Sequence, residues 1–249
     1  MKIFAHRGAM GQLPENTLES FHKAIELDAD GIELDVQLSR DGRLVVIHDE
    51  TLNRVCGKTY LPPLYVKDFS LCELKKMDVS ASCPGALFVS HIPALEEVLE
   101  LVKPTSLLIN IELKTDIISY NGIEEKLIQT VRDFGLNQRI IYSSFNHLTV
   151  ARIKRLASES NTAFILSQKL LNVAEYAAKY GINAIHPDFH TFAGSPDMTE
   201  QCRKHSVDVR VWNIRDKDVD FCREQHVDAI ITNYPERFTN NPQKENYEE

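Results

Sequence analysis

An acidic segment near the start of the chain holds the first residues whose types and spacing can do chemistry. In residues 29–37, ADGIELDVQ, Glu33 and Asp35 are two positions apart. Successive side chains of a strand point to opposite faces, so both carboxylates lie on the same face. Acidic residues on an exposed strand are usually solvated, whereas ionised carboxylates in a protein interior need a cation. We therefore regard Glu33 and Asp35 as candidate metal ligands.

A second acidic segment, residues 107–114, LLINIELK, repeats this arrangement. Glu112 and Lys114 share one face, where on their own they would form an ordinary salt bridge. In a barrel of parallel strands, however, the carboxyl ends of all strands meet at one rim, and there Glu112 can join Glu33 and Asp35. Three carboxylates without histidine or cysteine ligands are typical of a site for one hard divalent cation, Ca²⁺ or Mg²⁺, with Mn²⁺ as a further candidate.

Two histidines lie at the ends of apolar segments, His6 in Ala-His-Arg-Gly and His48 in Val-Ile-His-Asp. A lone histidine in such a place is more often a capping or core residue. Two of them beside a rim of carboxylates indicate a general base and a general acid, because imidazole titrates near neutral pH. Arg7 adds a planar donor that suits a phosphate, and Lys114 adds a point charge. The set predicts attack at the phosphorus of an anionic substrate.

The elements that must position these residues alternate along the chain. Short apolar segments rich in Val and Ile are separated by segments with helical periodicity, which is typical of a parallel sheet with crossover helices. Nine segments have strand patterns: 2–5, 31–37, 44–48, 106–113, 139–143, 163–166, 183–186, 208–212 and 228–232. Seven have helical patterns: 17–27, 94–102, 122–134, 147–157, 171–180, 199–205 and 216–225. Asn16, with Glu19 three residues later, is predicted to cap the first helix.

The segment between the second and third predicted strands, residues 38–43, is too short for a parallel crossover. Asp41-Gly42 is instead a signal for a two-residue hairpin, in which residues whose numbers sum to about 83 face each other. This register places His48 opposite Asp35. Without this one antiparallel strand, eight parallel strands remain, the number that a small closed barrel needs. Since 249 residues is the length of one such domain, we predict an α/β fold, a (β/α)8 TIM barrel.

Residues 49–91 interrupt the alternation, because they contain several proline and glycine turns and only one short helical pattern. We interpret them as a small insertion within a barrel domain of residues 1–239. The insertion begins directly after His48, so we expect it at the mouth of the active site, where barrel loops carry function. Residues 240–249 are polar and lack apolar periodicity, and we predict that they form a disordered tail.

Composition and charge exclude several classes of protein. Hydrophobic residues make up 43% of the chain and charged residues 26%, enough for a sizeable core without disulfides. The net charge of −8 argues against a nucleic-acid partner and offers no basic patch for anionic lipid. Five widely spaced cysteines without a CxxC pair fit a reducing, cytoplasmic setting. The chain has neither the apolar run of a signal peptide nor one long enough to span a membrane, so we expect no stable membrane anchor.

Nine short motifs occur in register along the chain. They are His6-Arg7-Gly8, Pro14-Glu15-Asn16-Thr17, Glu33-Leu34-Asp35-Val36, Val46-Ile47-His48-Asp49, residues 92–99 (IPALEEVL), Ile111-Glu112-Leu113-Lys114, Ser143-Ser144-Phe145, Val211-Trp212-Asn213 and residues 230–235 (IITNYP). In their order, and in their coverage from about residue 2 to 238, they resemble the glycerophosphodiester phosphodiesterase family, a group of phospholipase C-like phosphodiesterase barrels.

The resemblance implies a (β/α)8 barrel and roles for residues already singled out. It assigns general base and general acid catalysis to His6 and His48. Arg7 and Lys114 would contact the phosphate. The metal ligands that it implies are Glu33, Asp35 and Glu112. Residues 49–91 correspond to the family's characteristic insertion.

Three segments depart from the family's usual pattern. Residues 52–56, LNRVC, stand where Leu-Asp-Arg-Thr-Thr is common, and residues 213–215, NIR, stand where Thr-Val-Asn usually follows the tryptophan. Residues 232–235, TNYP, replace the more usual Thr-Asp-Tyr-Pro. These changes bear on substrate contacts and local turns, and they leave every proposed catalytic and metal-binding residue in place.

Three residues near predicted strand ends are further candidates for substrate contact. Trp212 can pack on the alcohol portion of a substrate, or it can be a core residue. Phe145 has the same two interpretations. His186 lies at the carboxyl end of the sixth parallel strand and can line the site.

Together these inferences predict a metal-dependent hydrolase of small glycerophosphodiesters, the deacylated forms of phospholipids. The products would be sn-glycerol 3-phosphate and an alcohol such as choline or ethanolamine, formed by direct attack of water or through a cyclic phosphate. The alternatives are a lysophospholipase D or phosphatidylinositol phospholipase C-like lipid phosphodiesterase, and a non-catalytic barrel that binds a phosphorylated metabolite. A homo-oligomer is compatible with the sequence.

Overall fold

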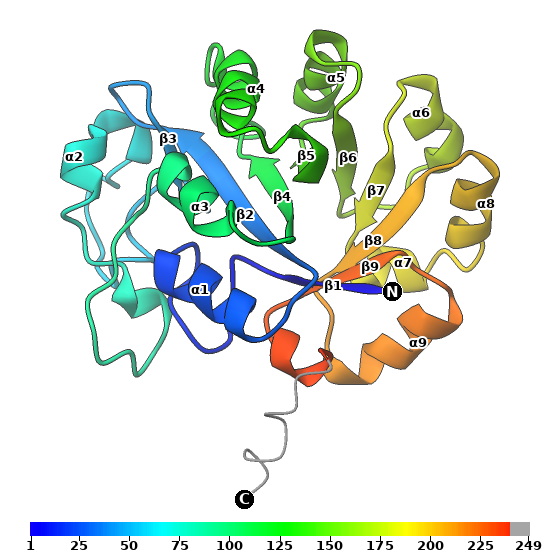
Figure 1. Cartoon of the computed structure of the whole chain (residues 1–249), viewed down its shortest axis with the longest axis horizontal. Helices are drawn as coiled ribbons and strands as arrows, with labels where there is room; N and C mark the ends of the chain where they lie inside the picture. The colour runs from blue at the N-terminus through cyan, green and yellow to red at the C-terminus, as the bar shows by residue number, and fades with distance from the viewer. Residues whose placement is uncertain (240–249) are drawn as a thin grey trace, which may run out of the picture.

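The computed structural model describes residues 1–239 of the chain. Figure 1 shows strands gathered around a common centre with helices outside them. The strands are β1 Lys2–Ala5, β2 Gly31–Leu38, β3 Leu44–Val46, β4 Leu108–Leu113, β5 Ile140–Ser144, β6 Asn161–Leu166, β7 Ala184–Pro187, β8 Asp208–Trp212 and β9 Ala229–Thr232. The helices are α1 Leu18–Glu26, α2 Leu71–Leu74, α3 Leu95–Val102, α4 Ile123–Phe134, α5 His147–Leu156, α6 Val173–Lys179, α7 Phe189–Ala193, α8 Met198–Lys204 and α9 Val219–Glu224.

Eight of the strands form a closed barrel. They follow the order β1-β9-β8-β7-β6-β5-β4-β2, and a further pairing of β1 with β2 closes the ring. Every pair in this ring is parallel. The remaining strand, β3, is antiparallel to β2. The predicted (β/α)8 barrel with one added antiparallel strand is therefore confirmed.

The barrel strands alternate between two environments, as their sequences require. On β2, Ile32, Leu34 and Val36 belong to the apolar layer between the barrel and its helices. That layer also contains one face of α3, where the buried residues recur at helical spacing. A separate cluster that includes Phe4, Ile141, Ala163, Ala184, Ala229 and Ile231 packs together. Because Glu33 and Asp35 alternate with the outward residues of β2, their side chains turn into the barrel.

The turn between β2 and β3 differs from the prediction by one residue. The paired residues, such as Val36 with Val46, have numbers that sum to 82 rather than 83. Gly42 has a φ of 71°, and the backbone of Ser39 bonds to both Gly42 and Arg43, which closes a three-residue loop. The predicted pairing of His48 with Asp35 is therefore wrong.

His48 reaches the centre of the barrel by another route. The residue opposite Asp35 is Ile47, whose N–H donates to the Asp35 carbonyl over 3.0 Å. Beyond β3, the side-chain amide of Gln37 donates to the carbonyls of Ile47, His48 and Asp49 at 3.1, 3.0 and 2.8 Å. This clamp fixes the backbone of residues 47–49 where the chain leaves the pairing with β2.

The segment between β3 and α3 consists of turns and short helices. It contains α2 and two 3₁₀ turns, Val66–Asp68 and Ser80–Ser82. Eight buried residues unite it with the β3 segment in one apolar cluster: Val45, Ile47, Leu52, Val55, Val66, Leu74, Val79 and Ile92. The boundaries of the predicted insertion, residues 49–91, stay a prediction, and the predicted disordered tail lies outside the described residues. Within residues 1–239, no helix is both long and apolar enough to cross a membrane.

Candidate active site

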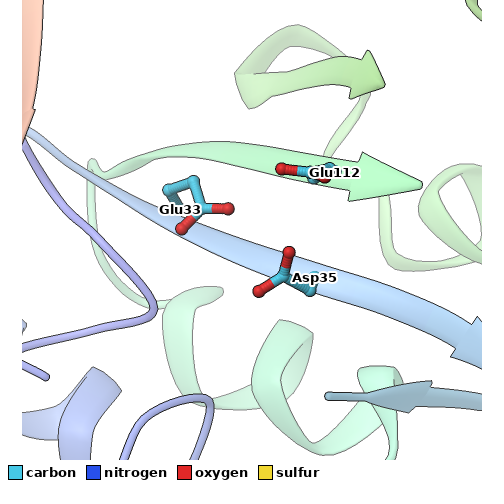
Figure 2. A group of neighbouring side chains, drawn as sticks. All are labelled: Glu33, Asp35 and Glu112. Carbon is cyan, nitrogen blue, oxygen red and sulfur yellow. The ribbon is translucent and has the colours of Figure 1, made fainter. Parts of the chain in front are cut away.

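The three predicted metal ligands come together between β2 and β4 (Figure 2). These strands are parallel neighbours, and their register pairs Asp35 directly with Glu112. Glu33, two residues before Asp35, points to the same side. One oxygen of each carboxylate lies within 4.8 Å of the others, although the residues are only 1% to 8% exposed. The fold thus brings three acidic side chains together at a site that is almost completely buried from solvent.

The electrostatics of this cluster fit a bound cation. Burial, reinforced by the charges of Asp35 and Glu112, raises the pKa of Glu33 well above its usual range. Burial also raises the pKa of Glu112. Burial acts the same way on Asp35, but Arg7 and His48 help to outweigh it, and the pKa of Asp35 falls to about 2. Asp35 Oδ1 is buried without a hydrogen-bond partner among residues 1–239. A hard divalent cation would relieve the repulsion and use this free oxygen.

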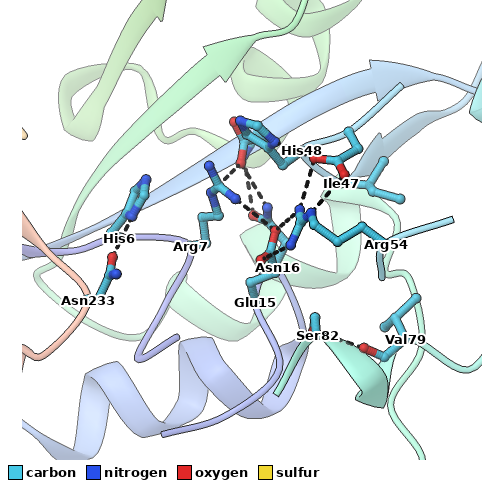
Figure 3. A network of polar contacts seen from close by, with 12 residues as sticks. His6, Arg7, Glu15, Asn16, Ile47, His48, Arg54, Val79, Ser82 and Asn233 are labelled. Atoms are coloured by element: carbon cyan, nitrogen blue, oxygen red, sulfur yellow. Dashed lines mark hydrogen bonds and ion pairs between the residues drawn. The ribbon is translucent and has the colours of Figure 1, made fainter. Parts of the chain in front are cut away.

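His6, which follows β1, is oriented by Asn233, which follows β9. His6 Nδ1 lies 2.7 Å from Asn233 Oδ1 (Figure 3). On the other side of the ring, His6 Nε2 lies 3.8 Å from Glu33 Oε2. An amide oxygen only accepts, so Nδ1 carries the proton and Nε2 keeps its lone pair. Burial, together with the charge of Arg7, lowers the pKa of His6 to about 4. The ring is therefore neutral near neutral pH, and its Nε2 can accept a proton.

Arg7 turns toward the carboxylates because the backbone bends sharply after β1. Arg7 and Gly8 have φ values of 51° and 78°. A Cβ on Gly8 would lie 2.6 Å from the backbone carbonyl carbon of Ser20, so only glycine fits. The bend lets the Arg7 N–H donate to Glu33 Oε2 over 2.9 Å and brings Arg7 Nε to 3.4 Å from Asp35 Oδ2.

A chain of ion pairs connects the segment that follows β1 with the segment that follows β3 (Figure 3). Arg54 donates to both oxygens of Glu15, at 2.7 and 2.8 Å, and to both oxygens of Asp49, at 2.7 and 2.9 Å. Glu15 also accepts from Arg7 over 2.9 Å. Asp49 Oδ1 lies 2.7 Å from His48 Nδ1. Arg54 therefore fixes the His48 ring relative to the phosphate-binding candidate Arg7.

Lys114 links the acidic cluster to the aromatic wall of the site. Its Nζ lies 2.9 Å from Glu112 Oε1 and 3.4 Å from His48 Nε2. Although burial opposes it, the charge of Glu112 raises the pKa of Lys114, so the ammonium stays charged. The same Nζ lies 5.8 Å from the centre of the Phe145 ring. Phe145 in turn meets Trp212 edge to face, with ring centres 5.8 Å apart.

A cavity of about 330 Å³ lies at the carboxyl ends of the strands. The predicted site residues that line it are His6, Arg7, Glu33, His48, Glu112, Phe145, His186 and Trp212. A larger hollow of about 910 Å³ lies against α4 and α5 outside the barrel, and none of these eight residues lines it. The smaller cavity is therefore the candidate active site.

A comparison of the whole chain with models of protein families tests whether the short motifs reflect membership of a family. Residues 6–237 match the model of the glycerophosphoryl diester phosphodiesterase family. This chain is a member of that family. The match covers the barrel from the residue after β1 to the residues beyond β9, and it confirms the resemblance seen in the sequence.

Individual members of the glycerophosphoryl diester phosphodiesterase family are similar over nearly the whole chain. A glycerophosphodiester phosphodiesterase of Caldanaerobacter subterraneus is 38% identical over 96% of both chains. One of Bacillus altitudinis is 38% identical over 95% of this chain and 96% of its own. The structure of a phosphodiesterase of Oleispira antarctica, in complex with the product sn-glycerol-3-phosphate, matches with a TM-score of 0.81 and 27% identity, covering 95% of this chain and 94% of that one.

Several residues that hold this site together, among them Arg54, Asp49 and Asn233, were given no role there by the sequence, and Asn16 contacts a predicted metal ligand directly. Asn16 was expected to cap α1, but Thr17 and Ser20 form the cap. Asn16 instead has a φ of 56° and binds Asp35 twice: its Nδ2 donates to Oδ2 over 2.8 Å, and its Oδ1 accepts from the backbone N–H over 3.3 Å. Asparagine tolerates this left-handed backbone better than most residues. Its place in the Pro-Glu-Asn-Thr motif was the signal that pointed to the site.

Proposed function

We propose that this chain hydrolyses glycerophosphodiesters to sn-glycerol 3-phosphate and an alcohol such as choline or ethanolamine. The observation that carries the proposal is that His6 and His48 line one cavity together with Glu33 and Glu112, two members of the buried cluster of three carboxylates. Membership of the family and the product bound by the Oleispira relative support the substrate class. The free state of all five cysteines supports a reducing, cytoplasmic setting.

Glu33, Asp35 and Glu112 would hold one divalent cation, Ca²⁺ or Mg²⁺, with Mn²⁺ as a further candidate. When bound, the cation would polarise a phosphate oxygen and offset the charge that develops on it. Arg7, which lines the cavity, and Lys114, which pairs with Glu112, would add fixed positive charge beside the acidic cluster. These two residues would therefore hold the phosphate against the acidic cluster.

His6 and His48 would divide the proton transfers. His6 Nε2 would take a proton from the attacking oxygen, water or a substrate hydroxyl, as that oxygen bonds to phosphorus. The bond from phosphorus to the alcohol oxygen breaks, and His48 would protonate the departing oxygen from Nε2, in a form of the ring in which that nitrogen carries a proton and no longer accepts from Lys114 Nζ. Asp49 Oδ1, at 2.7 Å from His48 Nδ1, would accept the N–H of that nitrogen and hold the ring in place for this role.

Removal of divalent metal tests the mechanism directly. We expect chelation to lower kcat/KM for glycerophosphocholine by at least about a hundredfold, and Mg²⁺, Ca²⁺ or Mn²⁺ to restore it. His6→Ala should lower kcat by a similar factor, because general base catalysis contributes about 10²- to 10⁴-fold. Turnover that survives chelation, or that survives His6→Ala, would refute the mechanism.

Exposed apolar side chains favour lipid phosphodiesters as a second candidate class of substrate. Leu61 and Leu87, in the segment between β3 and α3, are 86% and 98% exposed. Leu171, in the loop after β6, is 96% exposed. A lysophospholipase D or phospholipase C-like enzyme would turn over lysophosphatidylcholine faster than glycerophosphocholine. A non-catalytic barrel would bind sn-glycerol 3-phosphate and turn over neither substrate.

A further inference from the structure

His186, on β7, is a buried histidine that the proposed mechanism does not use. It is 1% exposed, and it lines the 330 Å³ cavity. In the ring of eight strands, β7 stands four places from β2, which carries Glu33 and Asp35. His186 therefore belongs to the wall opposite the acidic cluster.

The neighbours of His186 determine which of its nitrogens carries a proton. Arg210 Nη1 lies 3.2 Å from His186 Nε2, and Arg210 is itself held by Asp208 over 2.8 Å. A guanidinium can only donate, so Nε2 must accept and Nδ1 must carry the proton. Burial, together with the charge of Arg210, lowers the pKa of His186 well below its usual range, so the ring is neutral.

The Nδ1–H of His186 has no acceptor, and few polar groups surround it on the β7 side of the cavity. Nδ1 is buried and has no partner within residues 1–239. The indole N–H of Trp212 is already used, because it donates to the His186 carbonyl over 3.0 Å. The other neighbours on this side of the cavity include Ile165 and Ile231, which are apolar.

Across the cavity, Asn110 Oδ1 is likewise buried and without a partner in the described chain. Buried polar groups are rarely left unpaired, so a ligand with neutral polar groups fits here.

We propose that His186 is a specificity-determining residue whose Nδ1–H donates a hydrogen bond to a glycerol hydroxyl of the substrate. The inference rests on the proposed function and names the part of the substrate that the β7 wall recognises. The phosphate is drawn to Arg7 and Lys114 on the other wall. A quaternary ammonium head group offers no acceptor to Nδ1–H, and the charge of Arg210 beside the ring repels it. A hydroxyl accepts from His186 and keeps a proton for an acceptor such as Asn110 Oδ1.

The proposal is tested by measuring the affinities of two phosphate monoesters that carry the same charge. We compare sn-glycerol 3-phosphate with propyl phosphate, which has no hydroxyls, by titration calorimetry in the presence of Mg²⁺. We expect the wild-type protein to prefer sn-glycerol 3-phosphate by about three- to tenfold, the range of one neutral hydrogen bond. His186→Leu should lose this preference by weakening sn-glycerol 3-phosphate alone.

A second variant separates hydrogen bonding from packing. In His186→Gln, the side-chain oxygen can accept from Arg210 while the amide N–H donates to the ligand, so the preference should largely return. His190→Leu is the matched control, because His190 lies exposed on α7 outside the cavity. It should retain the wild-type preference.

The outcomes distinguish this inference from the proposed function. Equal affinity of the wild type for the two phosphates, or an unchanged preference in His186→Leu, would overturn the role of His186. Equal weakening of both ligands in His186→Leu would also overturn it, since that result indicates a purely structural role. The absence of glycerophosphodiester turnover would refute the proposed function. The preference for sn-glycerol 3-phosphate over propyl phosphate would still show whether His186 binds a hydroxyl.

Discussion

At the scale of single residues, Asn233 selects the working form of His6. The two are 227 positions apart in sequence, and the amide oxygen holds the proton of His6 on Nδ1. A carboxylate, as in the family's more usual Thr-Asp-Tyr-Pro motif, would orient the ring in the same way. It would also add a fourth negative charge near Glu33, whose pKa is already raised by burial and by its acidic neighbours. The amide orients the His6 ring, the proposed general base, without adding to this repulsion.

Substitution of Asn233 tests this role. We expect Asn233→Ala to lower kcat for glycerophosphocholine by about tenfold or more with a small change in KM, because an unanchored ring loses the orientation on which base catalysis depends. Asn233→Asp keeps an acceptor for Nδ1 and should retain more of the wild-type kcat. Steady-state kinetics at saturating metal measures both. If Asn233→Asp is as impaired as Asn233→Ala, orientation through an oxygen acceptor is not the reason for this contact.

The strand residues of the site were predictable from the sequence, whereas their loop partners were not. Glu33, Asp35 and Glu112 follow from two local facts, the two-residue period of a strand and the convergence of parallel strand ends. Asn16 and Arg54 reach the site from loops. A loop's path depends on packing against distant segments, so their contacts with Asp35, Glu15 and Asp49 have no local signature.

At the scale of elements, the β2–β3 hairpin shows how one residue of register changes the surroundings of His48, the proposed general acid. Asp41-Gly42 indicated a turn at the correct place, but Ser39 widens it by one residue. Its Oγ accepts from the Arg43 N–H over 2.9 Å and bonds to Asp41 Oδ1 over 2.7 Å. A shift of one residue exchanges the two faces of a strand. His48 is therefore placed by the Gln37 clamp beyond the strand rather than by strand pairing.

Gly42 supports this register through its backbone conformation. Its φ is 71°, and an added Cβ would meet nothing within 4 Å, so only backbone strain opposes a side chain. We expect Gly42→Ala to lower the free energy of unfolding by about 1 kcal/mol. Gly42→Asn should cost less, because asparagine tolerates the left-handed region. Urea denaturation measures both changes, and an unaltered midpoint in Gly42→Ala would mean that the turn relaxes freely.

At the scale of the whole molecule, the barrel places the acidic cluster and the neutral ring of His186 on opposite halves. The half formed by β1, β2 and β4 carries the acidic cluster with Arg7 and Lys114. The half around β7 and β8 holds the neutral His186 above the Arg210–Asp208 pair. The number of parallel strands was predictable from the recurring apolar segments, but this division was not. It depends on which inward positions face each other across a closed ring.

The buried, neutral His186 gives the stability of the molecule a pH dependence. Above pH 6.5 the ring is neutral in both the folded and the unfolded chain, and its contribution to stability is fully present. As the pH falls from 6.5 toward the much lower folded-state pKa, only the unfolded chain takes up the proton. The free energy of unfolding should then fall by up to about 1.4 kcal/mol per pH unit from this residue.

Urea unfolding at pH 7.5 and pH 5.5 measures this effect. Glutamine does not titrate, so His186→Gln should lose less stability between the two pH values than the wild type, by about 1 kcal/mol. Equal losses in the two proteins would show that His186 takes up its proton in the folded state.

The pairing of β1 with β9 has a consequence for how the molecule is made. Four residues of β1 pair with β9, and the His6 backbone N–H donates to Thr232 over 2.9 Å. On the ribosome, β1 emerges more than 200 residues before β9, at roughly 5–20 residues per second. Until then the nascent sheet has open edges along β1 and β8. A chain arrested before β9 therefore carries both strands that supply the acidic cluster, but its first histidine still awaits the partners that orient it.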